Sequence, residues 1–145
     1  MLHGWHIGVV IPARDEEAHI AGVIEGLPET VDIAVVVNDG STDATSERAV
    51  SATARCEVVV IEGNGDGVGA SIDRGHRALL GRFNGPFISV VMAGDGQMNP
   101  DDLEHLIQPI IDNKADHVKG NRAMHEHGLN RMPAHRQRAS RVCLL

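Results

Sequence analysis

The chain has few aromatic residues and few cysteines. Only 2% of its 145 residues are aromatic, and none is tyrosine. This argues against modules that bind nucleic acid by stacking bases on aromatic side chains, so we expect no nucleic-acid partner. The two cysteines, Cys56 and Cys143, lie far apart and form no CxxC motif. This spacing indicates a reducing, cytoplasmic environment and no cysteine-ligated zinc site.

Long hydrophobic runs are missing as well. No stretch reaches the roughly 20 apolar residues that a membrane-spanning helix needs. Hydrophobic residues nevertheless make up 42% of the chain, which is enough for a folded domain with a modest core. The length indicates one domain, which we assign to residues 1–145.

Negative charge dominates, but it is distributed unevenly. The net charge is −7, and the part from residue 119 onward has six basic residues and one acid, Glu126. This end therefore carries +5, and residues 1–118 carry −12. A basic segment beside an acidic body suits an anionic ligand or peripheral contact with a membrane surface. A solvated basic helix face is the alternative. The basic residues are Lys119, Arg122, Arg131, Arg136, Arg138 and Arg141.

Apolar runs and helical periodicities alternate along the chain. Expected strands cover 7–11, 33–37, 58–61 and 87–92, with a short further candidate at 116–119. Expected helices cover about 15–27, capped by Asp15, then 43–54, 69–82 and about 100–110. This alternation predicts an α/β fold with a mostly parallel, doubly wound sheet and right-handed crossovers.

The strand expected at 87–92 ends in Ala93-Gly94-Asp95-Gly96-Gln97. Open α/β sheets bind ligands beyond the carboxyl ends of their strands. A hard divalent cation readily takes a carboxylate together with phosphate oxygens. This run is therefore a candidate site for a metal-bound phosphate compound, while an ordinary strand-to-loop turn is the alternative.

Two other strand ends carry acids. In Asn38-Asp-Gly-Ser-Thr-Asp43, Asp39 can accept hydrogen bonds from a nucleobase or ribose edge, while Asp43 or Ser41 suits a helix cap. In the run 12–17, the dipole of the following helix explains Asp15 and Glu17. Glu16 is the acid that we expect to face a ligand.

A glycine-rich loop, 63–69, follows the third expected strand. It mimics the dinucleotide fingerprint GxGxxA, but that fingerprint belongs after the first strand of its unit. We interpret the loop as one that lets backbone approach a ligand closely. Further on, Arg122 and Arg131 are spaced irregularly, as loop arginines that converge on phosphate can be.

Taken in order, these motifs resemble family 2 of the inverting glycosyltransferases, particularly the polyprenyl-phosphate sugar transferases. The matching runs are VVIPARDEE (9–17), VVNDGSTD (36–43), GVGASIDRG (67–75), MAGDGQMNPDD (92–102), KGNR (119–122) and RMP (131–133). The resemblance covers nearly the whole chain and implies the Rossmann-like GT-A nucleotide-sugar-binding fold. It also implies transfer of a hexose from a nucleotide-diphosphate sugar to a lipid-phosphate (dolichyl-type) acceptor, with Mg²⁺ or Mn²⁺.

The resemblance also implies roles for individual residues. The donor nucleotide would be bound by Pro12, Ala13, Glu16, Asp39, Gly40, Ser41 and Gly69, with Asp39 holding the base. The metal and the donor diphosphate would be held by Asp95 and Gln97. The catalytic set would be Asp95, Arg122 and Arg131, with both arginines on phosphates of donor or acceptor. The donor part would span about 5–122, and 123–145 would be a basic acceptor-side segment.

The expected reaction agrees with the charges involved. A departing nucleoside diphosphate accumulates negative charge, which a metal or an arginine stabilises. A phosphate acceptor is already anionic, so it needs positioning more than a general base.

Two departures from the family pattern affect these expectations. The family often has a carboxylate two positions before Asp95, where this chain has Ala93, so one metal ligand is lost. Family catalytic domains also extend further than this chain, so we expect an incomplete C-terminal half of the fold. One alternative is therefore a non-catalytic or fragmentary nucleotide-sugar-binding module that self-associates into a homo-oligomer through an exposed sheet edge. A nucleotidyltransferase is a weaker alternative, because 13–17 lacks the basic motif of such enzymes.

Overall fold

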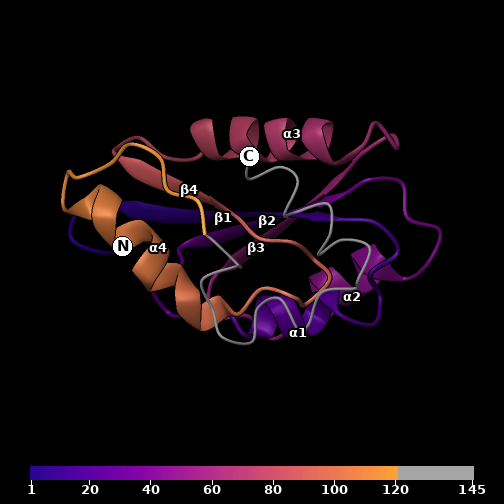
Figure 1. Ribbon diagram of the computed structural model, residues 1–145. Helices are drawn as coiled ribbons and strands as arrows, with labels where there is room; N and C mark the ends of the chain where they lie inside the picture. Colours follow the sequence, from indigo (N-terminus) through magenta and orange to yellow (C-terminus); the bar gives the residue numbers. More distant parts are fainter. Residues whose placement is uncertain (121–145) are drawn as a thin grey trace, which may run out of the picture.

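Residues 1–120, the part described by the computed structural model, form a sheet of four parallel strands with helices on both faces (Figure 1). The strands are β1 (His6–Ala13), β2 (Ile33–Asn38), β3 (Glu57–Glu62) and β4 (Phe87–Val91). The helices are α1 (Ile20–Glu25), α2 (Thr45–Ser51), α3 (Val68–Leu80) and α4 (Leu103–Ile111), and a 3₁₀ turn, η1 (Pro100–Asp102), precedes α4. The α/β fold with a parallel sheet is confirmed.

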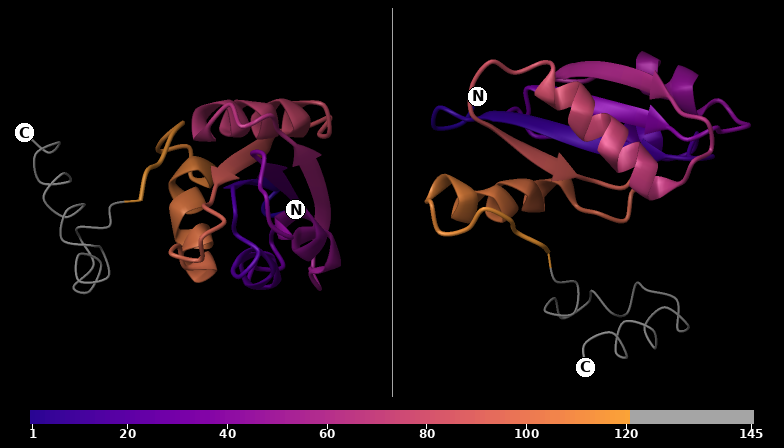
Figure 2. Two further views of the ribbon diagram at one scale, coloured as in Figure 1. Left: turned by 90° about the vertical axis from the view of Figure 1, so that its right-hand side faces the viewer. Right: turned by 90° about the horizontal axis from the view of Figure 1, so that it is seen from above.

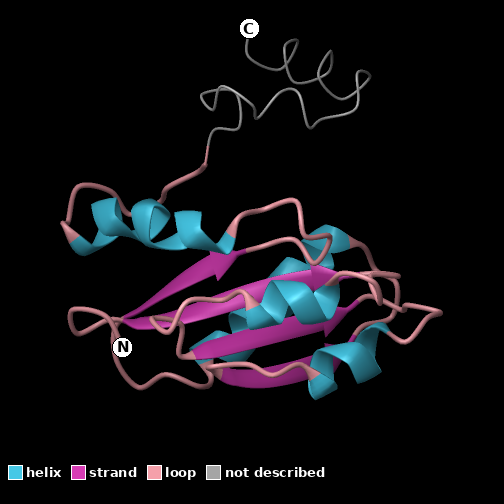
Figure 3. Ribbon diagram, turned by 90° about the horizontal axis from the view of Figure 1, so that it is seen from below, coloured by secondary structure: helices cyan, strands magenta, loops and turns pink. Residues whose placement is uncertain are grey.

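The order of the strands in the sheet is β3-β2-β1-β4. The chain steps outward from β1 to β2 and β3, then returns to the other side of β1 as β4. The carboxyl ends of β1 and β4 therefore flank the point where the strand order reverses, which is where open α/β sheets bind ligands. Figure 3 shows all four arrows pointing the same way, so the loops that follow the strands gather at one edge of the sheet.

The two faces of the sheet bury different side chains of the same strands. Along β1, Ile7, Val9 and Ile11 pack with α1, α2 and α4, whereas Val10 packs with Leu79 of α3. Figure 2 shows α3 on one side of the sheet and the other three helices on the opposite side. Because β1 and β2 are covered on both faces, their sequences are almost continuously apolar and not alternating.

Helix α3 lies unusually close to β1 at Gly75. A Cβ atom at this position would lie 2.3 Å from Cγ1 of Val10. The helix can therefore approach the strand only because residue 75 has no side chain. This contact fixes the position of α3 against β1.

Three sequence-based boundaries were wrong. Residues 116–119 form no strand, and Val118 is the segment's single large apolar residue, so it has little to bury against the sheet. Helix α1 begins at Ile20 and not near Asp15, because Asp15 has a positive φ of 53° and cannot cap it. Helix α2 ends at Ser51, three residues before the expected end. Within residues 1–120, no helix has the length and apolar character needed to cross a bilayer.

Candidate functional site

Three loops meet at the carboxyl end of β1. The amide of Asp39, just after β2, donates to the carbonyl oxygen of Ala13 at 2.9 Å. On the other side, the amide of Gly94 donates to the carbonyl oxygen of Pro12 at 3.3 Å. A Cβ at Gly94 would lie 3.1 Å from that of Ala13, so the β4 loop fits tightly against β1 before Asp95 begins. The expected strand ends are therefore brought together.

The loop after β1 is fastened to the loop after β2 by reciprocal hydrogen bonds. The carboxylate of Asp15 accepts from the amide of Thr42 at 2.7 Å, and the carboxylate of Glu17 accepts from the amide of Ala44 at 3.0 Å. In the opposite direction, the amide of Glu17 donates to Asp43 at 3.1 Å. Asp15 and Glu17 thus hold two loops together, which explains why Asp15 does not cap α1.

Glu16 lies between these two acids but has a different environment. Its amide is held by the hydroxyl of Thr45 at 2.9 Å, so its backbone is fixed, and its side chain is half-buried. Burial raises the pKa of Glu16, and the negative charge of Asp95 raises it further, while His19 opposes the shift. The carboxylate of Asp95, after β4, thus disfavours ionisation of Glu16, after β1, and a cation would relieve this repulsion.

Asp95 forms a turn through one of its two carboxylate oxygens. Its Oδ1 accepts from the amide of Gln97 at 3.0 Å. The side chain of Gln97 is exposed, and Ala93 is half-buried, with its amide directed at the sulfur of Met98 at 3.4 Å. The turn interpretation and the ligand interpretation of this run are therefore compatible.

The fit of a divalent cation depends on this donor set. Residues 1–120 contain no cluster of three His, Cys, Asp or Glu side chains arranged to hold a metal. Asp95, with Glu16 and Gln97 nearby, supplies few oxygens. Mg²⁺ commonly binds one or two carboxylates, keeps several waters and takes its remaining ligands from substrate phosphates. The residues present therefore fit a metal that arrives with a diphosphate better than a metal bound alone.

Asp39 is the most deeply buried acid of the site, at 4% exposure. Its Oδ2 accepts from the amide of Gly67, at the start of α3, at 2.8 Å. Its Oδ1 has no hydrogen-bond partner within residues 1–120. Its neighbour Asn38 is also buried and donates to Glu62 at 2.8 Å and to Ser46 at 2.7 Å. This polar network at the ends of β2 and β3 was not anticipated from the sequence.

The structure brings most of the expected donor residues together. Six of them lie at the ends of β1 and β2 or on the loops that follow: Pro12, Ala13, Glu16, Asp39, Gly40 and Ser41. Asp95 lies near Glu16, on the loop after β4. The hydroxyl of Ser41 is used within the loops, accepting from the amide of Asp15 at 2.9 Å. Gly69 lies in the first turn of α3 with open space where a Cβ would be. Arg122 and Arg131 lie outside the described residues.

Two shallow surface hollows lie elsewhere on the described part. One, of about 430 Å³, is lined by Val50 and Val60 between α2 and β3. The other, of about 580 Å³, is lined by His105 and Pro109 on α4. Neither is lined by Glu16, Asp39 or Asp95, so the candidate site lies outside both hollows, at the carboxyl edge of the sheet.

Comparison with known proteins agrees with this geometry. Residues 8–143 match the profile of Glycosyl transferase family 2. An uncharacterized protein of Methanocaldococcus jannaschii is 35% identical over 129 residues, covering 88% of this chain and 51% of the relative. The UDP-N-acetylglucosamine–dolichyl-phosphate N-acetylglucosaminyltransferase of Methanococcus voltae is 29% identical over 142 residues, covering 88% of this chain and 56% of the relative.

Solved structures give the same result. Glucosyl-3-phosphoglycerate synthase from Mycobacterium tuberculosis superposes with a TM-score of 0.57 at 30% identity, covering 74% of this chain and 42% of the synthase. Its complex with Mn²⁺, UDP and glucosyl-3-phosphoglycerate also gives 0.57, at 29% identity, covering 74% of this chain and 40% of the synthase. The chain spans about half the length of the curated relatives it matches. With a family match over almost its entire length, the chain belongs to glycosyl transferase family 2.

Proposed function

We propose that this chain binds a nucleotide-diphosphate sugar at the carboxyl ends of β1, β2 and β4. The observation that carries the proposal is the convergence of Asp39, Glu16 and Asp95 at the reversal of strand order. Asp39 holds the base, Pro12 and Ala13 line the base and ribose with Glu16, and the backbone of Gly40, Ser41 and Gly69 completes the donor site.

The diphosphate lies at the β4 side of the candidate site in this proposal. Asp95 and Gln97 would hold a Mg²⁺ or Mn²⁺ ion beside the donor phosphates, with the carboxylate of Glu16 close by. When bound, the metal stabilises the negative charge of the departing nucleoside diphosphate. The synthase complex that contains Mn²⁺ and UDP supports this choice of cofactor.

The acceptor is a phosphate compound, and a polyprenyl (dolichyl-type) phosphate is the one that we favour. The relative from Methanococcus voltae is named for a dolichyl-phosphate acceptor, and the synthase from Mycobacterium tuberculosis has been crystallised with phosphoglyceric acid. Both acceptors are anionic. The six basic residues from 119 onward, among them Arg122 and Arg131, supply positive charge for such an acceptor and for peripheral membrane contact on the cytoplasmic side.

Transfer needs little proton chemistry from the protein. An acceptor phosphate oxygen attacks the anomeric carbon as the bond to the donor diphosphate breaks, and the configuration is inverted. Because the nucleophile is already ionised, the chain's own groups orient the reactants and stabilise charge. Asp95, Arg122 and Arg131 are the residues that we place in this role.

Donor binding is tested first by thermal unfolding with UDP, GDP and Mn²⁺. A ligand at 100 times its Kd stabilises the native state by about 2.7 kcal/mol. We expect such a gain with nucleotide and metal together, and its loss in Asp95→Asn. Asp101→Asn, an exposed acid of η1, should keep the gain. The proposal fails if wild type gains nothing from any nucleotide.

This chain matches only about half the length of its relatives, which is consistent with one alternative function. In this alternative the chain is a nucleotide-sugar-binding module that does not catalyse transfer. Such a module would bind nucleotide without releasing UDP or GDP in the presence of sugar donor and acceptor, and would self-associate in sedimentation experiments. A turnover assay with polyprenyl phosphate and with phosphoglycerate separates this module from a transferase, and at the same time separates the two acceptors.

A further inference from the structure

Two buried polar atoms of opposite character lie beneath the glycine loop. Within residues 1–120, neither Oδ1 of Asp39 nor Nη1 of Arg74 has a hydrogen-bond partner. Both atoms border the same spot, because a Cβ at Gly63 would lie 3.2 Å from the first and 2.8 Å from the second. Buried polar atoms are normally hydrogen-bonded, so a pair of exceptions at one place requires an explanation.

The same two side chains are each held by the loop through another atom. Oδ2 of Asp39 accepts from the amide of Gly67 at 2.8 Å, and Nη2 of Arg74 pairs with Asp66 at 3.1 Å. The loop thus lies over both side chains and supplies one hydrogen-bond partner to each. Its side-chain tether is weak, because Asp66 is 48% exposed and surface ion pairs contribute little.

The backbone of the loop is suited to movement. Gly65 and Gly67 have φ values of 78° and 94°, and no heavy atom of residues 1–120 lies within 4 Å of where a Cβ on either would be. Residues 64–66 are exposed. Few packing contacts and many solvent-exposed groups are typical of segments that open locally at low cost.

We propose that Arg74 is a second nucleobase-binding residue, and that loop 63–67 lifts to uncover it together with Asp39. This inference rests on the proposed donor site. A carboxylate oxygen that accepts, next to a guanidinium nitrogen that donates, complements a ring N–H beside a carbonyl oxygen. Uracil and guanine carry this edge. Cytosine presents an unprotonated ring nitrogen where uracil has its N–H, so it would turn a lone pair toward the carboxylate.

The competing explanation is that Arg74 is only structural, balancing the charges of Asp39 and Asp66. The two explanations differ in which ligands bind more weakly when Arg74 is replaced. A base-binding role affects nucleotides and their discrimination, and leaves binding of metal pyrophosphate unchanged. A structural role lowers stability and weakens all ligands together.

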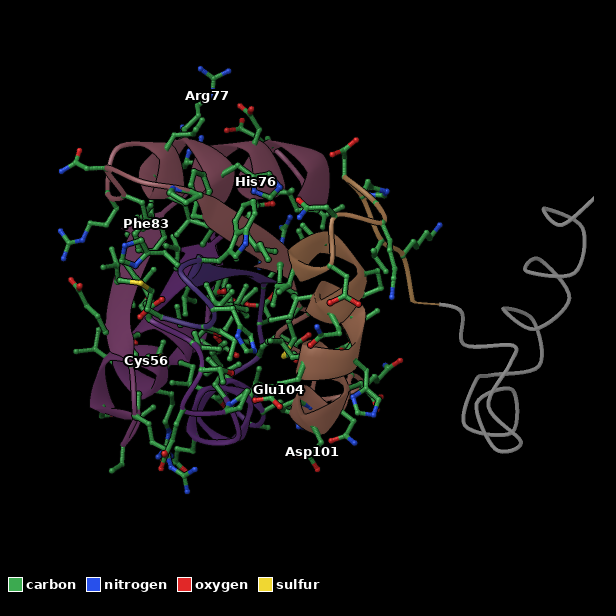
Figure 4. The ribbon with its side chains drawn as sticks, turned by 90° about the vertical axis from the view of Figure 1, so that its left-hand side faces the viewer. Cys56, His76, Arg77, Phe83, Asp101 and Glu104 are labelled. Carbon is green, nitrogen blue, oxygen red and sulfur yellow. The ribbon has the colours of Figure 1, made fainter. Side chains whose placement is uncertain are left out.

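The test measures affinities of UDP, GDP, CDP and pyrophosphate, each with Mn²⁺, by calorimetry on the full chain. We expect Arg74→Met to weaken UDP or GDP, whichever wild type prefers, by about tenfold or more, since a hydrogen bond to a charged group is lost. The variant's preference for that nucleotide over CDP should shrink, and its affinity for pyrophosphate should equal that of wild type. Arg77→Met is the matched control, because Arg77 lies on the same helix, pairs with Asp73 at 2.8 Å and points away from the sheet (Figure 4).

A second variant changes the tether alone. Asp66→Asn leaves Arg74 in place and weakens the loop's hold on it, so nucleotide affinity should stay equal or rise. A structural role for the ion pair predicts a loss in both variants, and that result would overturn the inference. If Arg74→Met does not fold, Arg74→Lys, which keeps the charge but not the planar fork, should show the same selective loss for the nucleotide.

The outcomes separate this inference from the proposed function. If wild type binds no nucleotide, the donor site itself is wrong. If wild type binds nucleotide and Arg74→Met behaves like Arg77→Met, the donor site stands and the role of Arg74 is wrong.

Discussion

The amide of Asp39 donates a hydrogen bond to the carbonyl oxygen of Ala13 at 2.9 Å. This bond extends the β1–β2 pairing beyond the last strand residues, Ala13 and Asn38. The carboxylate that we assign to the base is therefore positioned by the sheet itself and not by a free loop. A site placed on rigid elements in this way can hold a ligand at small entropic cost.

A second acid at position 93 should strengthen metal binding. Ala93 is half-buried two residues before Asp95, so Ala93→Asp adds a carboxylate beside the present one. Since cation affinity rises with the number of charged oxygen ligands, we expect Mn²⁺ to bind several-fold more tightly, even without nucleotide. Titration calorimetry with Mn²⁺ measures the change. Ala93→Asn is the control, and equal behaviour of the two variants would contradict the prediction.

Glu16→Gln should stabilise the fold at neutral pH. Burial and the charge of Asp95 raise the pKa of Glu16 above its ordinary 4.5. The folded state therefore holds the proton more readily than the unfolded chain, and wild type loses stability as pH rises from 4.5 through the raised pKa. The variant should melt higher than wild type above this range and at the same temperature below it.

The control for Glu16 is Glu47→Gln, which removes an acid from the first turn of α2. The helix dipole stabilises a negative charge in the first turn, so this variant should gain no stability at neutral pH. Melting curves between pH 3.5 and 8 for the three proteins decide the matter. Equal pH profiles for wild type and Glu16→Gln would refute the assignment of the shifted group.

Asp32→Asn should lower stability at neutral pH and have less effect in acid. Burial alone would raise the pKa of Asp32, but hydrogen bonds from the amine of Met1 at 2.6 Å and the amide of Ile7 at 2.8 Å outweigh it and lower the pKa below 3.8. The stability from this carboxylate is present above pH 3.8 and is lost as pH falls through the lowered pKa.

We expect a loss of about 1–2 kcal/mol at pH 7 for Asp32→Asn, shrinking in acid, by denaturant unfolding. Asp73→Asn breaks an exposed pair with Arg77 and should cost almost no stability at any pH. A difference for Asp32→Asn that does not change with pH would count against this account.

Gly75→Ala should separate α3 from the sheet. The added Cβ would meet Val10 at 2.3 Å, so the helix or the strand must shift, at about 1–3 kcal/mol. Gly22→Ala, in α1 with nothing within 4 Å, should instead stabilise by about 0.5–1 kcal/mol, because alanine favours a helix over glycine. Denaturant unfolding of both variants checks the opposite signs. A neutral Gly75→Ala would show that the close contact is not needed.

Sequence reasoning found the strands and the acids at their tips because both are local signals. An apolar run such as 33–37 predicts a buried strand without reference to the rest of the chain, and Asp95 follows soon after such a run. Contacts between distant loops left no such signal. The bond of Asp15 to Thr42 joins residues 27 positions apart, and it changed the expected start of α1. Arg74 falls within the expected helix 69–82 and no local pattern marks it, and only the packing of α3 puts it beneath the glycine loop beside Asp39.

The hydrogen bonds that join the β1 loop to the β2 loop give the candidate site two unequal sides. Glu16 stands on the side braced by Asp15 and Glu17, while the carboxylate of Asp95 is held by a bond within its own turn. If Asp95 held a cation with Glu16 close by, donor binding would set the position of the β4 loop. It would leave the base end of the site unmoved, because the loops after β1 and β2 are already joined there.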